Sequence, residues 1–154
     1  MQKSLISFVL AVLVVGTVAA EPSTGTRIWD GTRIGIAAYT ATGAVVYSGS
    51  TLFAYPSLDS VGTSALALGA YTLPNSMMLL GLYQGNADRV RFWRRAAAIT
   101  QTGMAAFVAG IGVYGLAVHT DGDLGSLVGP LFILASVPLF SIASLHYTPY
   151  YMER

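Results

Sequence analysis

The chain has no cysteine and very little charge, and both absences limit what it can be. Without cysteine it has no disulfide, no thiolate catalysis, no cysteine-ligated zinc and no iron–sulfur cluster. Charged residues make up only 10% of its 154 residues, whereas about a quarter is usual in a soluble domain. Because 54% of the residues are hydrophobic, polar groups cannot cover the surface of a globule. The composition therefore predicts an integral membrane protein, with the lipid bilayer as its main partner.

The few positive charges are concentrated in one short stretch. Four of the eight Lys and Arg residues lie between two long runs that contain no charge. The formal net charge is only +1, and one short basic stretch is too small a surface for nucleic acid. A basic loop between two apolar runs is instead typical of the membrane surface. We expect this loop to contact anionic lipid headgroups through five side chains: Arg89, Arg91, Trp93, Arg94 and Arg95.

Long hydrophobic runs are what the sequence has in abundance. Four uncharged runs occupy residues 34–54, 61–83, 96–118 and 124–147. A helix that rises about 1.5 Å per residue needs about 20 residues to cross a membrane, so each run is long enough. Apolar residues are contiguous within the runs, which argues against the alternating strands of a membrane barrel. Because the connections are short, we expect an all-α membrane protein with an up-down bundle of four transmembrane helices.

The first 20 residues have the pattern of a secretory signal peptide. Lys3 precedes an apolar core, and small residues up to Ala20 stand before Glu21 and Pro22. The alternative is that residues 1–20 stay attached as a first transmembrane helix, because their apolar run approaches spanning length. In both cases residues 21–33 are a polar segment before the four helices, and residues 148–154 are a short tail.

The signals for topology conflict. Positive residues favour the cytoplasmic side, which puts the basic loop inside. An exported signal peptide puts Glu21 outside, and two crossings then bring the basic loop outside as well. The side on which this loop lies therefore stays open, while the expected location is the cell or plasma membrane, which the chain crosses several times.

Small residues recur at helical spacing in two of the runs. Apolar surface gains nothing by hiding in lipid, so membrane helices associate where small residues let their backbones approach. We expect two such faces to pack the bundle, and to suit other membrane helices or further copies of the chain. They consist of Gly62, Ala65, Gly69, Thr72 and Ser76 in the second run, and of Gly103, Ala106 and Gly110 in the third.

Asn75 and Gln101 are the only strongly polar side chains deep within the runs. Counted from the basic loop between their helices, both lie in the same leaflet, so we expect the two amides to meet. Pro74 and Pro138 each remove a backbone hydrogen bond and predict kinks. Asn75 therefore has an alternative role, in which it binds the backbone group that Pro74 releases.

The runs offer no chemistry for catalysis. No Asp, Glu, Lys, Arg or His lies deep inside them, and a proton relay or a carboxylate cation site would need one. We therefore expect no enzyme activity and no cofactor. His119, Asp121 and Asp123 match only the opening of a calcium loop, so we expect a solvated turn and no metal site there.

The sequence favours a non-enzymatic structural or interaction subunit that acts through its small-residue helix faces. The alternative is a transport or channel component. In that case Asn75, Gln101 and the kinked helices would line a path through an oligomer.

Overall fold

The computed structural model describes residues 23–118 and 125–153, and every regular element in these residues is helical. The first long helix is α2 (Thr24–Ala54). It is followed by one continuous helical rod that consists of α3 (Leu58–Ala67), the π-helical turn η1 (Leu68–Thr72) and α4 (Leu73–Tyr83). The last two long helices are α5 (Ala87–Val118) and α6 (Gly125–Leu145), and a 3-10 turn, η2 (Tyr151–Glu153), lies in the tail. The expected all-helical class is confirmed, while the signal-like segment 1–20 lies outside the described residues.

Three of these helices are long and apolar enough to cross a membrane: Leu58–Tyr83, Ala87–Val118 and Val128–Leu145. At most 33% of the most apolar stretch of each is buried inside the molecule, so large apolar side chains face outward along their length, as lipid contact requires. The fourth expected span is not confirmed, because α2 is not among these helices. Its 31 residues are numerous enough, but threonines, serines, tyrosines and glycines lower the hydropathy of residues 34–54.

Both α2 and α5 begin earlier than the apolar runs within them. Most of the polar segment 21–33 is helical, because Ser23 caps α2 and its hydroxyl accepts a hydrogen bond from Thr26 N at 3.3 Å. The basic stretch is also helix and not loop, because α5 begins at Ala87 and Asn86 Oδ1 accepts from Arg89 N at 2.9 Å. The apolar runs mark only the apolar part of each helix, whereas capping residues decide where the helix begins.

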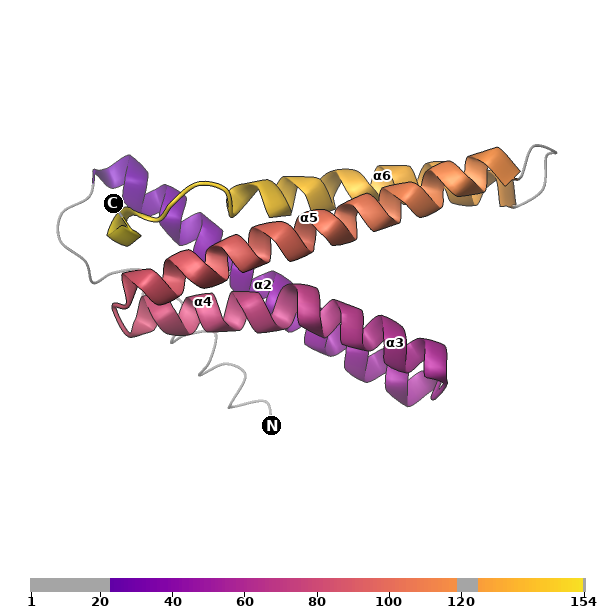
Figure 1. Cartoon of the computed structure of the whole chain (residues 1–154), viewed down its shortest axis with the longest axis horizontal. Helices are drawn as coiled ribbons and strands as arrows, with labels where there is room; N and C mark the ends of the chain where they lie inside the picture. The colour runs from indigo at the N-terminus through magenta and orange to yellow at the C-terminus, as the bar shows by residue number, and fades with distance from the viewer. Residues whose placement is uncertain (1–22, 119–124, 154) are drawn as a thin grey trace.

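The long helices alternate in direction and form an open bundle, in which the last long helix of the described chain does not pack back on the first. As Figure 1 shows, α2 lies along the rod formed by α3, η1 and α4, α4 lies along α5, and α5 lies along α6. Within the described residues, α6 makes extensive contact with α5 alone. The two hairpins therefore diverge away from the end at which α4 and α5 meet. The expected antiparallel order is present, and the expected closure of the four helices is not.

Close backbone approach explains why α6 packs on α5. A Cβ atom added at Gly112 would lie 2.8 Å from the carbonyl oxygen of Gly129, and one added at Gly129 would lie 2.9 Å from the carbonyl oxygen of Gly112. Only glycine permits this contact at both positions. The pair therefore fixes where the two helices touch.

A different set of small residues joins α2 to the rod. Side-chain hydroxyls also cross this interface: Ser48 Oγ donates to Ser64 O at 3.3 Å, and Thr72 Oγ1 donates to Ala41 O at 3.1 Å. The buried face of α2 contains alanines and one serine at spacings of three and four, namely Ala37, Ala41, Ala44 and Ser48. These residues let the two backbones approach without glycine.

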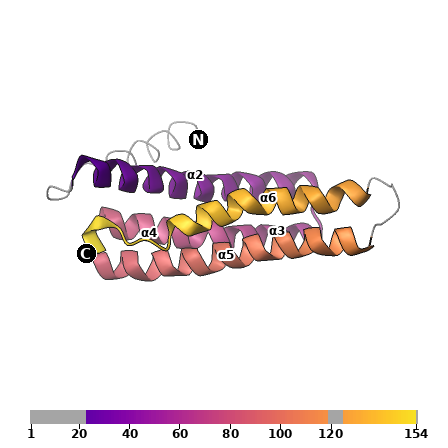
Figure 2. The same ribbon diagram turned by 90° about the horizontal axis from the view of Figure 1, so that it is seen from above.

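The end at which α4 and α5 meet holds the main apolar cluster, which contains Ile34, Ala37, Met78, Leu79, Val90 and Tyr150. Figure 1 and Figure 2 both place the C-terminal tail at this end, beside the beginnings of α2 and α5. The described charged residues other than Asp59 also lie here, because this is where α2 begins, where α5 begins and where the tail ends. This charged end therefore contains the candidate site.

Candidate functional site

Three elements meet at the charged end: the first turns of α2, the first turns of α5, and the tail that follows α6. Arg94 on α5 and Glu153 in the tail form an ion pair, in which Arg94 Nε lies 2.8 Å and 3.0 Å from the two carboxylate oxygens. The side chains are only 7% and 1% exposed. Arg94 also donates to the carbonyl oxygen of His146, and Glu153 Oε1 accepts from Tyr150 N at 2.9 Å. The pair therefore fastens the tail to α5.

Arg33 on α2 holds the same tail from the other side, and it is only 1% exposed. Its guanidinium lies 3.2 Å from Asp30 Oδ1, donates to the carbonyl of Thr148, and lies 3.9 Å from the ring centre of Tyr150. Asp30 Oδ2 in turn accepts from Tyr151 N at 2.9 Å. Each buried charge has an opposite charge and polar partners, as burial of an ion requires.

His146 is buried between these two arginines and lacks a partner of its own. The residue is 2% exposed, and neither ring nitrogen has a hydrogen-bond partner within the described residues. Burial, reinforced by the positive charges of Arg33 and Arg94, lowers the pKa of His146 to about 4. The imidazole is therefore neutral near pH 7, with one N–H to donate and one nitrogen to accept.

Burial acts on Tyr150 in the opposite sense, because the charged form of its hydroxyl is the anion. Desolvation raises the pKa of Tyr150 well above its usual range, and the nearby charges of Arg33, Asp30, Glu153 and Arg94 modify this effect. Tyr150 therefore stays neutral, and its ring serves as a surface on which the Arg33 guanidinium rests.

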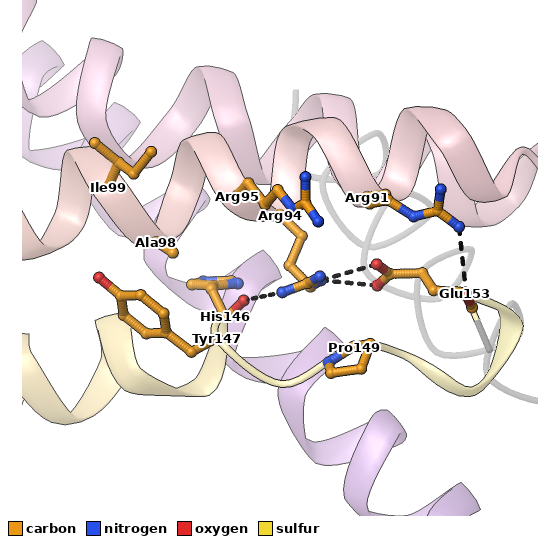
Figure 3. A pocket seen from close by; sticks show the side chains of 9 residues that line it. All are labelled: Arg91, Arg94, Arg95, Ala98, Ile99, His146, Tyr147, Pro149 and Glu153. Carbon is orange, nitrogen blue, oxygen red and sulfur yellow. Dashed lines mark hydrogen bonds and ion pairs between the residues drawn. The ribbon is translucent and has the colours of Figure 1, made fainter.

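A cavity of about 480 Å³ opens between α5 and the tail. We call it the arginine pocket, and its lining includes Arg91, Arg94, Arg95, His146, Tyr147 and Glu153. In Figure 3 the three arginines follow one another along α5, with Ala98 and Ile99 beyond them, and His146 and Tyr147 lie opposite on the tail side. Arg91 and Arg95 are exposed, whereas Arg94 and His146 are buried. The pocket is thus cationic, with one apolar side.

The five residues expected to contact lipid headgroups have different places in the structure. Arg91 and Arg95 are exposed, while Arg89 and Trp93 are partly buried. Arg94 differs from the expectation, because its side chain points into the protein and binds Glu153. The reason is the tail, whose Glu153 carboxylate lies at the charged end beside Arg94. The apolar runs alone gave no sign of this contact.

The expected hydrogen bond between Asn75 and Gln101 is present. Gln101 Nε2 donates to Asn75 Oδ1 at 3.2 Å, and both residues are fully buried. Asn75 Nδ2 also donates to Thr40 Oγ1 at 2.9 Å, which extends the link from α5 through α4 to α2. The carbonyl of Ala70, which would bind the missing N–H of Pro74, accepts instead from Thr100 Oγ1 at 3.1 Å. Asn75 is thus not needed as a partner for this carbonyl.

Most of the small residues expected to pack the bundle face outward instead. Thr72 and Ser76 are partly buried, but six others are exposed, and we call them the outward small residues: Gly62, Ala65, Gly69, Gly103, Ala106 and Gly110. The glycines among them have nothing within 4 Å of an added Cβ. Small residues permit close packing on several sides of these helices, and the positions of the buried amides and hydroxyls decide which side is used.

The charged cluster was missed as a site by sequence reasoning. The antiparallel order alone places residue 33, residues 91–95 and residues 146–153 at one end, and that signal was available. No group of three or more His, Asp or Glu side chains suited to a metal ion occurs in the described residues. His119, Asp121 and Asp123 lie outside the described ranges.

Comparison with known proteins provides no relative from which a function could be inferred. No family model matches the chain, and no curated protein and no solved structure matches it.

Proposed function

We propose that the chain is a multi-pass protein of the cell membrane, and that it acts without catalysis as a structural or interaction subunit. Its partner in this proposal is a second copy of the same chain, bound through the outward small residues. Three apolar helices long enough to span support the membrane assignment. The association rests on one observation: Gly62, Gly69, Gly103 and Gly110 have open space where a side chain would be.

The polar groups within the spans support a structural role. Asn75 binds both Thr40 and Gln101, and the hydroxyls of Thr72 and Thr100 bind backbone carbonyls of neighbouring helices. These bonds hold α2, the rod and α5 in register. They leave the outward small residues as surfaces on which a further helix can approach closely.

Energy transfer between labelled copies tests this association in liposomes. Gly69→Leu and Gly110→Leu should abolish the transfer signal, because a leucine side chain keeps two backbones apart. The matched control is Gly43→Leu, because Gly43 also has nothing within 4 Å of an added Cβ but lies on α2, outside the three apolar helices that carry the proposed surface. Transfer that is absent from the wild-type chain, or equal in all three variants, would contradict association through these residues.

A transport component is the second proposal, and one observation favours it. Gln101 Oε1 and the Tyr71 hydroxyl are buried without a partner in the described residues, and Tyr71 lies in the π-helical turn, a feature that often marks functional sites. Purified chain in liposomes should then conduct a solute or an ion, and Asn75→Leu should abolish that flux. Liposomes that stay tight under all tested gradients would rule out this role.

A further inference from the structure

We propose that the arginine pocket binds one phosphate group, which Arg95 and Arg91 neutralise and to which the ring N–H of His146 donates. This goes beyond the helix association proposed above and does not depend on it. It also differs from a general attraction of the charged end to anionic lipid, because it predicts one ligand held by particular side chains.

Charge is the first argument. Three arginines and one carboxylate line the pocket. The carboxylate of Glu153 is already occupied by Arg94 Nε and by the amide of Tyr150. Arg91 shares its charge with exposed Asp88 at 3.4 Å, and Arg95 makes no ion pair within the described part of the chain. The pocket therefore has an excess of positive charge at its mouth, where an anion can enter.

The second argument is the unpartnered imidazole. His146 lines the pocket, is 2% exposed, and has no hydrogen-bond partner on either ring nitrogen in the described residues. Buried polar groups rarely stay unpaired. The imidazole stays neutral because of its burial and, to a lesser extent, the nearby charges of Arg33 and Arg94. An anion at the mouth supplies an acceptor for its ring N–H.

Phosphate fits these donors better than a chloride ion or a single carboxylate does. Arginine presents several N–H groups in a planar fork that binds two oxygens at once. A phosphate has several acceptor oxygens in a tetrahedral arrangement, so that it reaches donors on α5 and on the tail together. Among the residues that line the pocket, Glu153 supplies the only carboxylate that competes for these donors.

The apolar side of the pocket, formed by Ala98 and Ile99, indicates that the ligand has an apolar part beside its phosphate group. Ile99 lies one turn beyond Arg95, in the direction in which α5 continues as an apolar span, and it is 69% exposed. Figure 3 places Ile99 and Ala98 at the end of the pocket away from Arg91. A phospholipid whose phosphate lies at Arg95 would lay its acyl chains along Ile99. A free phosphate ion would use the cationic end alone.

Native mass spectrometry of the full chain tests whether the bound phosphate group belongs to a phospholipid. Released from micelles that contain phosphatidylglycerol, the wild type should retain one lipid, and Arg95→Gln should bind it about fivefold more weakly, as expected for one Arg charge. Arg89→Gln is the matched control, because it removes the same charge from the same helix outside the pocket. Ile99→Gln should also weaken lipid retention.

A titration with inorganic phosphate, in a detergent without lipid, tests whether the pocket binds a free phosphate ion. The ring resonances of His146 should shift on addition of phosphate in the wild type and in Arg89→Gln, but not in Arg95→Gln. If this shift occurs while lipid is not retained, the site is a phosphate site whose ligand is soluble. If lipid is retained and Ile99→Gln weakens it, the ligand is a phospholipid.

The proposal is overturned by either of two results. One is an equal loss of lipid in Arg95→Gln and Arg89→Gln, which would show diffuse attraction to the charged end. The other is the absence of both retained lipid and a His146 shift in the wild type, which would show that the pocket binds no phosphate group.

Discussion

Arg33 and Arg94 are buried at the charged end, and each is held by a different set of partners. Arg94 has a carboxylate, whereas Arg33 combines the nearby Asp30 with backbone carbonyls and an aromatic ring. A buried ion pair adds little net stability compared with an apolar pair, but removal of one partner leaves a buried charge uncompensated. Loss of a carboxylate here should therefore cost far more than loss of one at the surface.

Glu153→Gln provides that comparison. The amide keeps the shape but leaves the Arg94 charge unpaired, so the free energy of unfolding should fall by about 3 kcal/mol. Asp88→Asn is the control, because Asp88 pairs with Arg91 while its side chain is 92% exposed, and the change there should stay within about 0.5 kcal/mol. Denaturant unfolding in detergent micelles measures both. Equal small effects would mean that the tail does not hold Arg94 in solution.

His146 should make the folded state sensitive to acid. Its pKa is lowered to about 4 in the folded chain from an ordinary value of 6.5, so the unfolded chain binds more protons between these two values. Stability is therefore complete above about pH 6.5 and declines as the pH falls towards 4, by about 3 kcal/mol in total. His146→Gln should flatten this part of the profile of unfolding temperature against pH. An unchanged slope would assign the acid sensitivity to another group.

At the residue scale, the sequence predicted the contact between Asn75 and Gln101 but not the burial of Arg33. Asn75 and Gln101 are the only amides in the long apolar runs, and a buried amide needs a hydrogen-bond partner, so the two had few alternatives to one another. Arg33 lies at the edge of an apolar run. The sequence does not show whether the Arg33 side chain faces water, lipid headgroups or the protein interior. Its burial depends on Tyr150 and Thr148, more than a hundred residues away.

Among the elements, the continuous rod from Leu58 to Tyr83 shows why the spacing of the small residues did not predict which face of the helix is buried. The small residues from Gly62 to Ser76 obey one α-helical spacing in the sequence, but the π-helical turn at Leu68–Thr72 lies between them. A π turn takes up more residues than an α turn, so it rotates α4 about the helix axis relative to α3. Gly62 and Gly69 are therefore exposed while Thr72 binds Ala41. Hydrophobicity and spacing do not reveal such a turn.

The contact between α5 and α6 can be tested with two glycines on the same helix. Gly112→Ala places a methyl group 2.8 Å from the Gly129 carbonyl oxygen, and we expect a loss of about 1–3 kcal/mol in stability, as for other overpacked sites. Gly110→Ala has open space and should be neutral or stabilising by about 0.5–1 kcal/mol, because alanine favours helix. Thermal unfolding of the two variants measures the difference. If both were equally tolerated, α6 would not pack at Gly112.

For the whole molecule, the sequence correctly predicted the helical class and the antiparallel order. It did not predict that the bundle stays open, with α6 packed mainly on α5. Length, apolar content and short connections suffice for antiparallel neighbours. Whether the last helix returns to the first depends on which surfaces fit closely. Here the approach of Gly112 and Gly129 holds α6 on α5, and α2 meets the rod through its alanines.

Because the described charged residues other than Asp59 lie at one end of the molecule, we expect them on the same side of a membrane. The chain has no native cysteine, so single cysteines can be labelled from one side with an impermeant maleimide. Asp88→Cys and Thr148→Cys should react from the same side, because the tail lies against the start of α5. Tyr55→Cys, in the connection between α2 and α3, should react from the opposite side. Opposite labelling of Asp88→Cys and Thr148→Cys would contradict the arrangement of the helices.

The tail also has a consequence for the order of events during synthesis. Arg33 and Arg94 leave the ribosome well before Glu153 does, and earlier segments of a chain generally begin to fold first. Until residues 148–153 arrive, both guanidinium groups lack most of the partners that compensate their burial. The charged end therefore stays hydrated until residues 148–153 dock against α2 and α5, so this docking follows the formation of the two helices.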